Sequence, residues 1–133
     1  MTGRRADRIV VAAAVVEREG LFLLTRRLAG THLAGTWEFP GGKCEPGESP
    51  GACLRREMRE ELGVEIDVRD TMLVTHHDYP ERSVELHFFR AAITGEPRPL
   101  LGQDMRWIAR ADLESLDFPE ADAELIRRLA AGE

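Results

Sequence analysis

Residues 41–64 read GGKCEPGESPGACLRREMREELGV, and this stretch decides how the rest of the chain is interpreted. Glu60 and Glu61 stand three and four residues after Glu57, so a helix here carries three carboxylates on one face. Like charges at these spacings oppose a helix by about 0.2–0.5 kcal/mol per pair. A bound divalent cation would offset that cost, because hard ions such as Mg²⁺ prefer oxygen ligands and are commonly shared with substrate phosphates.

The residues around the carboxylates predict a helix over roughly 49–62. Ser49 is a good N-cap, and Pro50 suits the first helical position, where its missing N–H costs nothing. Gly63 can adopt the left-handed conformation that ends a helix. The β-branched Val64 and Ile66 then begin a strand-like run. The stretch is therefore interpreted as a loop, a helix and a second loop.

A solvated helix is the ordinary explanation for such a run of charges, with Arg55, Arg56 and Arg59 pairing with the glutamates. That explanation accounts for neither Gly42 nor Glu48, nor for the spacing between them. We therefore prefer the explanation that includes a metal ion.

The same stretch matches every position of the Nudix box, so the chain resembles the Nudix superfamily. The box has seven fixed identities and two aliphatic positions, which would coincide by chance at about 10⁻⁹ per starting point at average residue usage. In this sequence, within box residues 42–64, the matching positions are Gly42, Glu48, Arg56, Glu57, Met58, Glu60, Glu61, Gly63 and Val64.

Length and composition indicate one domain over residues 1–133, because this length supports one real core and not two. Apolar residues make up 43% and charged residues 32%, and no apolar run approaches the 18 or so needed to span a bilayer. The basic start MTGRRADR lacks a convincing signal-cleavage pattern. We therefore expect a cytoplasmic protein whose Cys44 and Cys53 are reduced and structural.

The formal charge of −6 argues against broad binding to nucleic-acid backbone, which needs clustered Lys and Arg. A polyanionic small molecule would instead be bound by a metal ion and a few local cations. The expected partner is a nucleoside triphosphate, with no stable nucleic-acid binding, no membrane association, and a monomer or a weak homodimer as the assembly.

The remaining chain alternates predicted strands with turns. Apolar, β-rich runs at 9–16 and 21–25 flank a predicted turn at 17–20, and a short extended piece covers 36–39. Strands are expected near 64–76, 83–93 and 105–109, and the turn candidate Asp78-Tyr79-Pro80-Glu81 separates the first two. A final amphipathic helix is predicted to start at Asp117 or just after it. The pattern predicts an α/β class, and the resemblance implies the Nudix fold, an α/β/α sandwich with a mixed central β-sheet.

Beyond the box, the chain is similar to the MutT-type branch of that superfamily. The segments that carry this likeness are Thr25-Arg26-Arg27, Glu38 to Lys43, Tyr79-Pro80-Glu81-Arg82, Gly95-Glu96-Pro97 and Asp117-Phe118-Pro119. The resemblance implies hydrolysis of a nucleoside triphosphate, typically 8-oxo-dGTP, to a monophosphate and pyrophosphate, a reaction of nucleotide-pool sanitation and DNA repair.

The resemblance also implies roles for individual residues. The Gly41 carbonyl, Glu57, Glu60 and Glu61 would bind Mg²⁺, or Mn²⁺ in its place, with Glu57 the leading candidate for activating water. Catalysis would further involve Glu48 and Arg56, which are expected to pair and hold the loop against the helix.

At the substrate, Arg27 is the candidate phosphate clamp, because its guanidinium matches phosphate oxygens. His32 and Arg82 would border the nucleotide, and Asp122 would read the base. A surface arginine and an ordinary loop histidine are the alternatives for Arg27 and His32. Trp37 could stack on a base, although an aromatic residue in a short strand more often belongs to the core.

The chain departs from MutT at two positions. Leu101 replaces an acidic residue, so an auxiliary carboxylate must come from elsewhere, with Asp104 the nearest. Asp122 replaces an asparagine. An ionised carboxylate only accepts hydrogen bonds, which suits an amino group such as cytosine N4, whereas a buried, protonated Asp122 could still read an oxidised guanine. We expect 8-oxo-dGTP as the substrate, with CTP or a modified dCTP as the alternative.

Two other classes compete with this interpretation. ADP-ribose cleavage is another Nudix activity, and Pro80 does not discriminate against it. A non-enzymatic Nudix binding module would show an eroded box or an appended DNA-binding segment, and this chain shows neither.

Overall fold

The computed structural model describes residues 8–133, which form two four-stranded sheets and two α-helices. The first sheet has the order β5-β1-β7-β6, with strands β1 (Arg8–Val15), β5 (Gly41–Lys43), β6 (Glu65–Tyr79) and β7 (Arg82–Thr94). β1 runs parallel to β7 and antiparallel to β5, so this sheet is mixed, as predicted.

The second sheet is built around β3 (Leu21–Arg26), which pairs antiparallel with β2 (Glu17–Arg18), β4 (Trp37–Glu38) and β8 (Met105–Ala109). The sequence predicted a turn at 17–20, but only Glu19 and Gly20 form it. Both have positive φ, 53° and 79°, and this tight turn lets Glu17 and Arg18 pair with β3.

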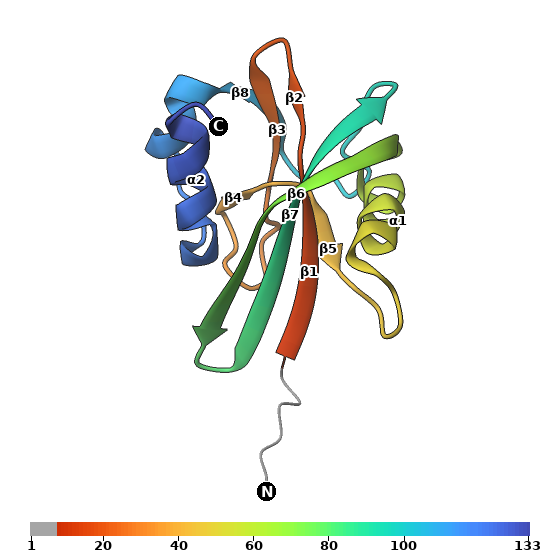
Figure 1. The fold of residues 1–133 in the computed structure, drawn as a ribbon, viewed down its shortest axis with the longest axis vertical. Coiled ribbons are helices and arrows are strands. Elements are labelled where there is room, and N and C mark those ends of the chain that lie inside the picture. The colour runs from red at the N-terminus through yellow and green to blue at the C-terminus, as the bar shows by residue number, and fades with distance from the viewer. Residues whose placement is uncertain (1–7) are drawn as a thin grey trace, which may run out of the picture.

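The two α-helices lie on opposite sides of the sheets (Figure 1). Helix α1 (Pro50–Leu62) packs on one side and α2 (Ala123–Ala130) on the other. Successive residues of β1 pack alternately toward the α2 side and the α1 side of the sheet. Ala13 and Val15 belong to the core cluster of α2, whereas Ala12 and Ala14 belong to that of α1. This alternation is the period-two pattern of a strand buried on both faces.

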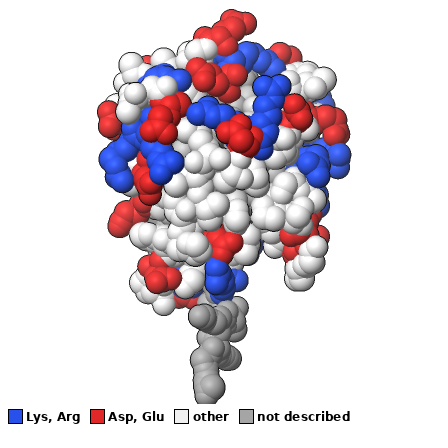
Figure 2. Space-filling view, in the orientation of Figure 1, with Lys and Arg blue, Asp and Glu red and all other residues white. Residues whose placement is uncertain are grey.

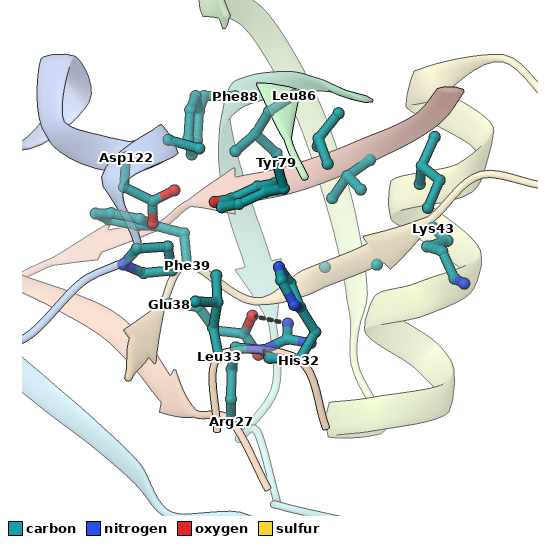
Figure 3. A pocket seen from close by; sticks show the side chains of 18 of the residues that line it. Arg27, His32, Leu33, Glu38, Phe39, Lys43, Tyr79, Leu86, Phe88 and Asp122 are labelled. Carbon is teal, nitrogen blue, oxygen red and sulfur yellow. Dashed lines mark hydrogen bonds and ion pairs between the residues drawn. The ribbon is translucent and has the colours of Figure 1, made fainter. Parts of the chain in front are cut away.

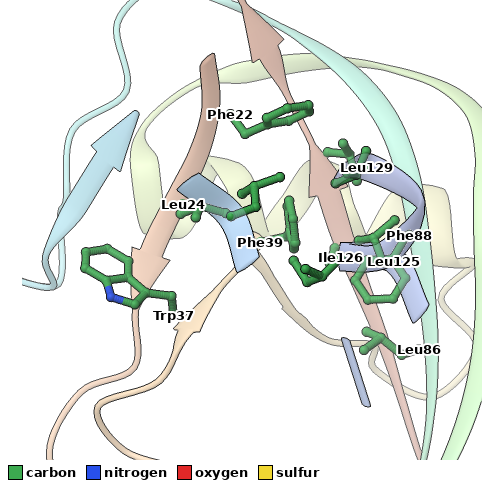
Figure 4. Packing of buried hydrophobic residues seen from close by; sticks show 12 residues of the cluster. Phe22, Leu24, Trp37, Phe39, Leu86, Phe88, Leu125, Ile126 and Leu129 are labelled. Carbon is green, nitrogen blue, oxygen red and sulfur yellow. The ribbon is translucent and has the colours of Figure 1, made fainter. Parts of the chain in front are cut away.

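The cluster on the α2 side combines the aromatic side chains of Phe22, Trp37, Phe39 and Phe88 with leucine and isoleucine side chains (Figure 4). Phe39 packs edge-on to Phe88, with ring centroids 6.1 Å apart, and stacks on Phe118 at 5.8 Å. Leu125 and Leu129 of α2 are fully buried against this group. The stacked Phe118 therefore fixes the segment that leads into α2.

The C-terminal helix begins later than the sequence predicted. Pro119 is extended, with φ −60° and ψ 151°, so the helix cannot start at Asp117. A short 3₁₀ turn, η2 (Glu120–Asp122), precedes α2. A second 3₁₀ helix, η1 (Arg110–Ser115), follows β8 and was not predicted.

The predicted β6–β7 pair is longer than expected and its turn is narrower. The ladder extends to the pair formed by Tyr79 and Arg82, which leaves only Pro80 and Glu81 between the strands. The hairpin tip therefore carries Tyr79 and Arg82 to the edge of the sheet, where they line a pocket.

No helix among residues 8–133 is long and apolar enough to cross a membrane. On the face seen in Figure 2, acidic and basic side chains alternate around a broad uncharged centre. This face therefore presents no continuous basic surface.

Candidate functional site

A pocket of about 350 Å³ opens between the first sheet, the loop after β3 and η2 (Figure 3). Its walls include the apolar side chains of Val11, Leu86 and Phe88, and more of its lining is apolar than polar. Polar groups reach it from separate segments of the chain: Arg27, His32, Glu38, Lys43, Arg82 and Asp122. An apolar cavity with a few convergent polar groups is the usual form of a small-molecule site.

The predicted box helix is present with the predicted caps. The Ser49 side chain accepts a hydrogen bond from the Ala52 N–H at 3.2 Å, and Gly63 ends the helix in the left-handed conformation with φ 67°. Cys53, Leu54, Met58 and Leu62 form its buried face. The carboxylates of Glu57, Glu60 and Glu61 come from the remaining positions.

Glu57 lies directly against the loop before the helix. A Cβ added to Gly42 would meet the Glu57 Oε1 atom at 2.3 Å. Gly42 and Gly41 both line the pocket. The glycine thus allows the helix carboxylate to approach the backbone of β5 closely.

Arg56 joins the loop to the helix. Its Nε and Nη2 atoms donate to the two Glu48 oxygens at 2.8 and 2.9 Å, and Nη2 also donates to the Lys43 carbonyl at 3.0 Å. These bonds confirm the predicted pairing of Glu48 with Arg56, and they lower the Glu48 pKa to about 2. The Nη1 atom donates to Glu57 at 3.0 Å and Glu60 at 3.2 Å.

Part of the alternative explanation, a helix stabilised by ion pairs, is therefore also present. Arg56 contacts Glu57 and Glu60, and Arg59 pairs with Glu65 at 2.7 Å. Residues 8–133 contain no three His, Cys, Asp or Glu side chains already arranged as a metal site.

Glu61 differs from the other helix carboxylates because the effect of its burial on its pKa outweighs the opposing charge of Arg27. Burial, and then the hydrogen bond and charge of Glu57, raise the pKa of Glu61 to about 9. Two carboxyl groups in contact and shielded from water are a suitable site for a hard divalent cation, which favours the ionised form of both. The oxygen donors present thus fit Mg²⁺ or Mn²⁺.

Arg27 and His32 lie together on the loop after β3. Arg27 donates from Nε to the His32 carbonyl at 2.5 Å and from Nη1 to Glu38 Oε1 at 2.9 Å. The His32 ring packs edge-on to Tyr79, with centroids 4.8 Å apart. Its Nε2 atom is buried and lacks a hydrogen-bond partner in the described part of the chain. A ligand in the pocket can supply that partner.

Asp122 lies at the far end of the pocket and is only 4% exposed. Although it stands at the N-cap position of α2, its side chain makes no capping hydrogen bond. Burial, and then the negative charge of Glu38, raise the pKa of Asp122 to about 7, while Arg27 opposes the rise. Near neutral pH this carboxyl is therefore both an acceptor and, in part of the molecules, a donor.

The structure thus places seven of the predicted site residues around two regions. Arg27, His32, Arg82 and Asp122 line the pocket together with Gly41, while Glu57 and Glu61 contact each other on the adjoining helix. Glu60 is more exposed, with 58% of its side chain accessible, and contacts Arg56.

Glu38 and Tyr79 also line the pocket, and we did not predict them as site residues. Glu38 lay within a quoted segment, but only the β3–β4 pairing reveals that it faces Arg27. Tyr79 marked a predicted turn, and its place in the pocket depends on the tip of the β6–β7 hairpin. Neither residue has a local sequence pattern that indicates a place in the pocket.

Three other sequence interpretations can now be compared with the structure. Trp37 is a core residue, 6% exposed, with the guanidinium groups of Arg26 and Arg106 over its ring. Asp104 lies 3.8 Å from Arg26, and Leu101 is 54% exposed. Trp37 therefore packs in the core, which was the alternative to stacking on a base.

Both cysteines are free thiols. Cys44 is half-buried, and Cys53 is fully buried in the core cluster of α1. Burial raises the pKa of each thiol, so neither is poised as a nucleophile. This agrees with the expectation of structural cysteines.

Comparisons with known proteins give relatives over most of the chain. The chain is 37% identical to an 8-oxo-dGTP diphosphatase of Haemophilus influenzae, over 91% of this chain and 90% of the relative. It is also 37% identical to a CTP pyrophosphohydrolase of Escherichia coli, over 88% of this chain and 86% of the relative.

Among solved structures, the solution structure of the E. coli ORF135 protein superposes with a TM-score of 0.82 at 34% identity. The match covers 94% of this chain and 90% of that one. The family model for the NUDIX domain matches residues 11–128. The chain therefore belongs to the NUDIX domain family.

Proposed function

We propose that this protein is a metal-dependent hydrolase that cleaves a nucleoside triphosphate, with 8-oxo-dGTP as the main substrate, into a nucleoside monophosphate and pyrophosphate. The observation that carries the proposal is the position of the pocket. Asp122 lines it, Arg27 lies within electrostatic reach of both Asp122 and the helix carboxylate of Glu61, and Gly42 lies against the carboxylate of Glu57. A nucleotide bound there would extend from the base at Asp122 to the phosphates at α1.

The Gly41 carbonyl, Glu57, Glu60 and Glu61 would hold Mg²⁺, or Mn²⁺ in its place. The ion would supply positive charge to the phosphate oxygens and acidify the attacking water. In the reaction, a water oxygen forms a bond to one of the two phosphorus atoms that the α–β bridging oxygen joins, and the bond between that phosphorus and the bridging oxygen breaks. Glu57 is our candidate to accept the proton of the water, because it is the carboxylate packed against the Gly42 backbone.

The other residues would bind and orient the substrate. Arg27 presents N–H groups for phosphate oxygens, while His32 and Arg82, which also line the pocket, would border the nucleotide. Glu48 and Arg56 hold the loop that carries Gly41 and Gly42 against α1. Their removal should disturb the geometry of the site as much as its chemistry.

Asp122 supports the choice of 8-oxo-dGTP and also identifies the alternative. Its pKa near 7 allows a protonated form that can donate to the O6 acceptor of an oxidised guanine. The ionised form only accepts, which suits the N4 amino group of cytosine. CTP or a modified dCTP is therefore the second candidate substrate, and a CTP pyrophosphohydrolase is among the relatives at 37% identity.

A role in nucleotide-pool sanitation, and through it in DNA repair, would follow from the main substrate. We propose that the protein acts in the cytoplasm, as a monomer or a weak homodimer, without stable binding to nucleic acid.

The test is turnover of a panel containing 8-oxo-dGTP, dGTP, CTP, 5-methyl-dCTP and ADP-ribose, with pyrophosphate distinguished from phosphate among the products. We expect pyrophosphate release that needs added Mg²⁺ or Mn²⁺, and the highest kcat/KM for 8-oxo-dGTP. Glu60→Gln should reduce kcat by at least about 10²-fold with an unchanged circular dichroism spectrum. Full activity in excess chelator, or turnover of ADP-ribose alone, would overturn the proposal.

A further inference from the structure

The guanidinium of Arg27 is held at two points before any ligand arrives. Pairing of β3 with β4 places Thr25 opposite Glu38, and Arg27 follows just beyond the end of β3. Its Nε atom donates to the His32 carbonyl at 2.5 Å, and its Nη1 atom donates to Glu38 Oε1 at 2.9 Å. The side chains of Arg27 and Glu38 are 30% and 27% exposed, so the pair is partly withdrawn from water.

These two contacts determine which N–H groups of Arg27 face a ligand. A guanidinium has five N–H donors in a fixed planar arrangement. The contacts to His32 and Glu38 use two of them, which leaves three for phosphate oxygens within the described part of the chain. Because the group is planar, fixing two of its edges also fixes the direction of the third.

Glu38 depends on this contact as much as Arg27 does. Burial raises the pKa of Glu38, and the charge and hydrogen bond of Arg27 counteract that rise. The Glu38 charge also raises the pKa of Glu61 and of Asp122, whereas Arg27 lowers both. The ion pair therefore lies within electrostatic reach of both the helix carboxylates and the base end of the pocket.

We infer that Glu38 is a positioning residue, which holds Arg27 in the orientation that binds the phosphate chain. This inference rests on the proposed function, since it specifies how the pocket places a triphosphate relative to α1. Glu38 acts through Arg27 and does not read the base. Its contribution to binding of the phosphate chain is therefore independent of the base, and it disappears when Arg27 is absent.

The experiment uses two probes. Isothermal titration measures binding of inorganic tripolyphosphate with Mg²⁺, which reports on the phosphate site without any base. Steady-state kinetics with 8-oxo-dGTP and CTP report KM and kcat separately. The variants are Glu38→Ala, Glu38→Gln, Arg27→Ala and the double variant that combines Arg27→Ala with Glu38→Ala.

We expect Glu38→Ala to raise the Kd for tripolyphosphate and the KM for both nucleotides by about tenfold, the effect of losing one charge-assisted hydrogen bond. Glu38→Gln keeps an acceptor oxygen for Nη1 and should remain within about threefold of the wild type. In the Arg27→Ala background, Glu38→Ala should add less than about twofold, because coupled residues are not additive.

Glu96→Ala is the matched control. Glu96 forms an ion pair with Arg18, also at 2.9 Å, away from the pocket lining, and its loss should leave both probes unchanged. Thermal unfolding identifies any variant that fails to fold. If Glu38→Ala fails to fold, Glu38→Gln still tests the role of Glu38.

The inference would be overturned if Glu38→Ala had its full effect in the Arg27→Ala background, or if it weakened nucleotide binding while leaving tripolyphosphate binding unchanged. If Glu38→Ala binds tripolyphosphate more weakly than the wild type but the wild type hydrolyses no nucleotide, the positioning role is supported and the proposed function is refuted. The two failures can therefore be told apart.

Discussion

Replacing Asp122 with Asn should stabilise the folded protein most above neutral pH and have no effect below about pH 4. Burial raises the pKa of Asp122 from 3.8 to about 7. The folded state therefore binds more protons than the unfolded state between these values, and stability falls as pH rises from about 4 to about 7. Above pH 7 the full cost of ionising the buried carboxyl is present.

The size of this cost follows from the shift. Each pKa unit corresponds to 1.36 kcal/mol, so the shift is worth at most about 4 kcal/mol. Asn is nearly isosteric with Asp and carries no charge, so the variant avoids the cost. For a chain of 133 residues, a gain of that size raises Tm by about 10 °C or more at pH 8.

Thermal unfolding of metal-free wild type and Asp122→Asn at pH 5, 6, 7 and 8 measures the effect. Glu120→Gln is the control, because Glu120 belongs to the same 3₁₀ turn and is exposed. We expect a Tm difference for Asp122→Asn that grows from pH 5 to pH 8, and none for the control. A difference that is constant over this range would refute the assignment of a raised pKa to Asp122.

The same substitution tests base selection. Asn donates and accepts at every pH, so Asp122→Asn should favour 8-oxo-dGTP over CTP. The wild type should lose its preference for 8-oxo-dGTP as pH rises through about 7, because Asp122 then loses its donor. A ratio of kcat/KM values that responds to neither the mutation nor the pH would show that the base is read elsewhere.

Four further outcomes are expected. Glu57→Gln should lower kcat by at least about 10²-fold at unchanged Tm, and an active variant would exclude Glu57 as the proton acceptor. Arg27→Lys keeps the charge but loses the planar array of donors, so titration should show weaker triphosphate binding. Gly42→Ala should displace Glu57, because the new Cβ would lie 2.3 Å from its Oε1 atom; a soluble, folded variant with normal activity would contradict this. Arg56 lowers the Glu48 pKa to about 2, so the wild type loses the stabilisation from this ion pair as pH falls from about 4.5 to about 2. Glu48→Gln should therefore make stability less dependent on pH in this range, as measured by acid unfolding followed by circular dichroism.

The box helix could be predicted from sequence because its signals are local. Ser49 and Gly63 act on backbone groups within one turn, and the apolar spacing of Leu54, Met58 and Leu62 defines the buried face. The pairing of Glu48 with Arg56 was also foreseen, from the resemblance to the family. These features need no knowledge of the rest of the chain.

The rest of the site depends on contacts between distant segments. Glu38 faces Arg27 where β4 pairs with β3, and Asp122 follows a segment whose Phe118 stacks on Phe39. The late start of α2 has a similar origin. Asp117 resembles an N-cap, but its carbonyl accepts a hydrogen bond from the Trp37 N–H at 2.8 Å, which ties the chain to β4.

The separation of the core into two clusters has a consequence for how this protein can change. The helix with the carboxylates packs in one cluster, whereas α2 and Phe39 pack in the other, and β1 divides them. Substitutions around Asp122 therefore perturb a layer that the box helix does not share. We expect the C-terminal segment to tolerate exchange between relatives while the box stays intact, so that the choice of nucleotide can diverge without loss of the hydrolytic machinery.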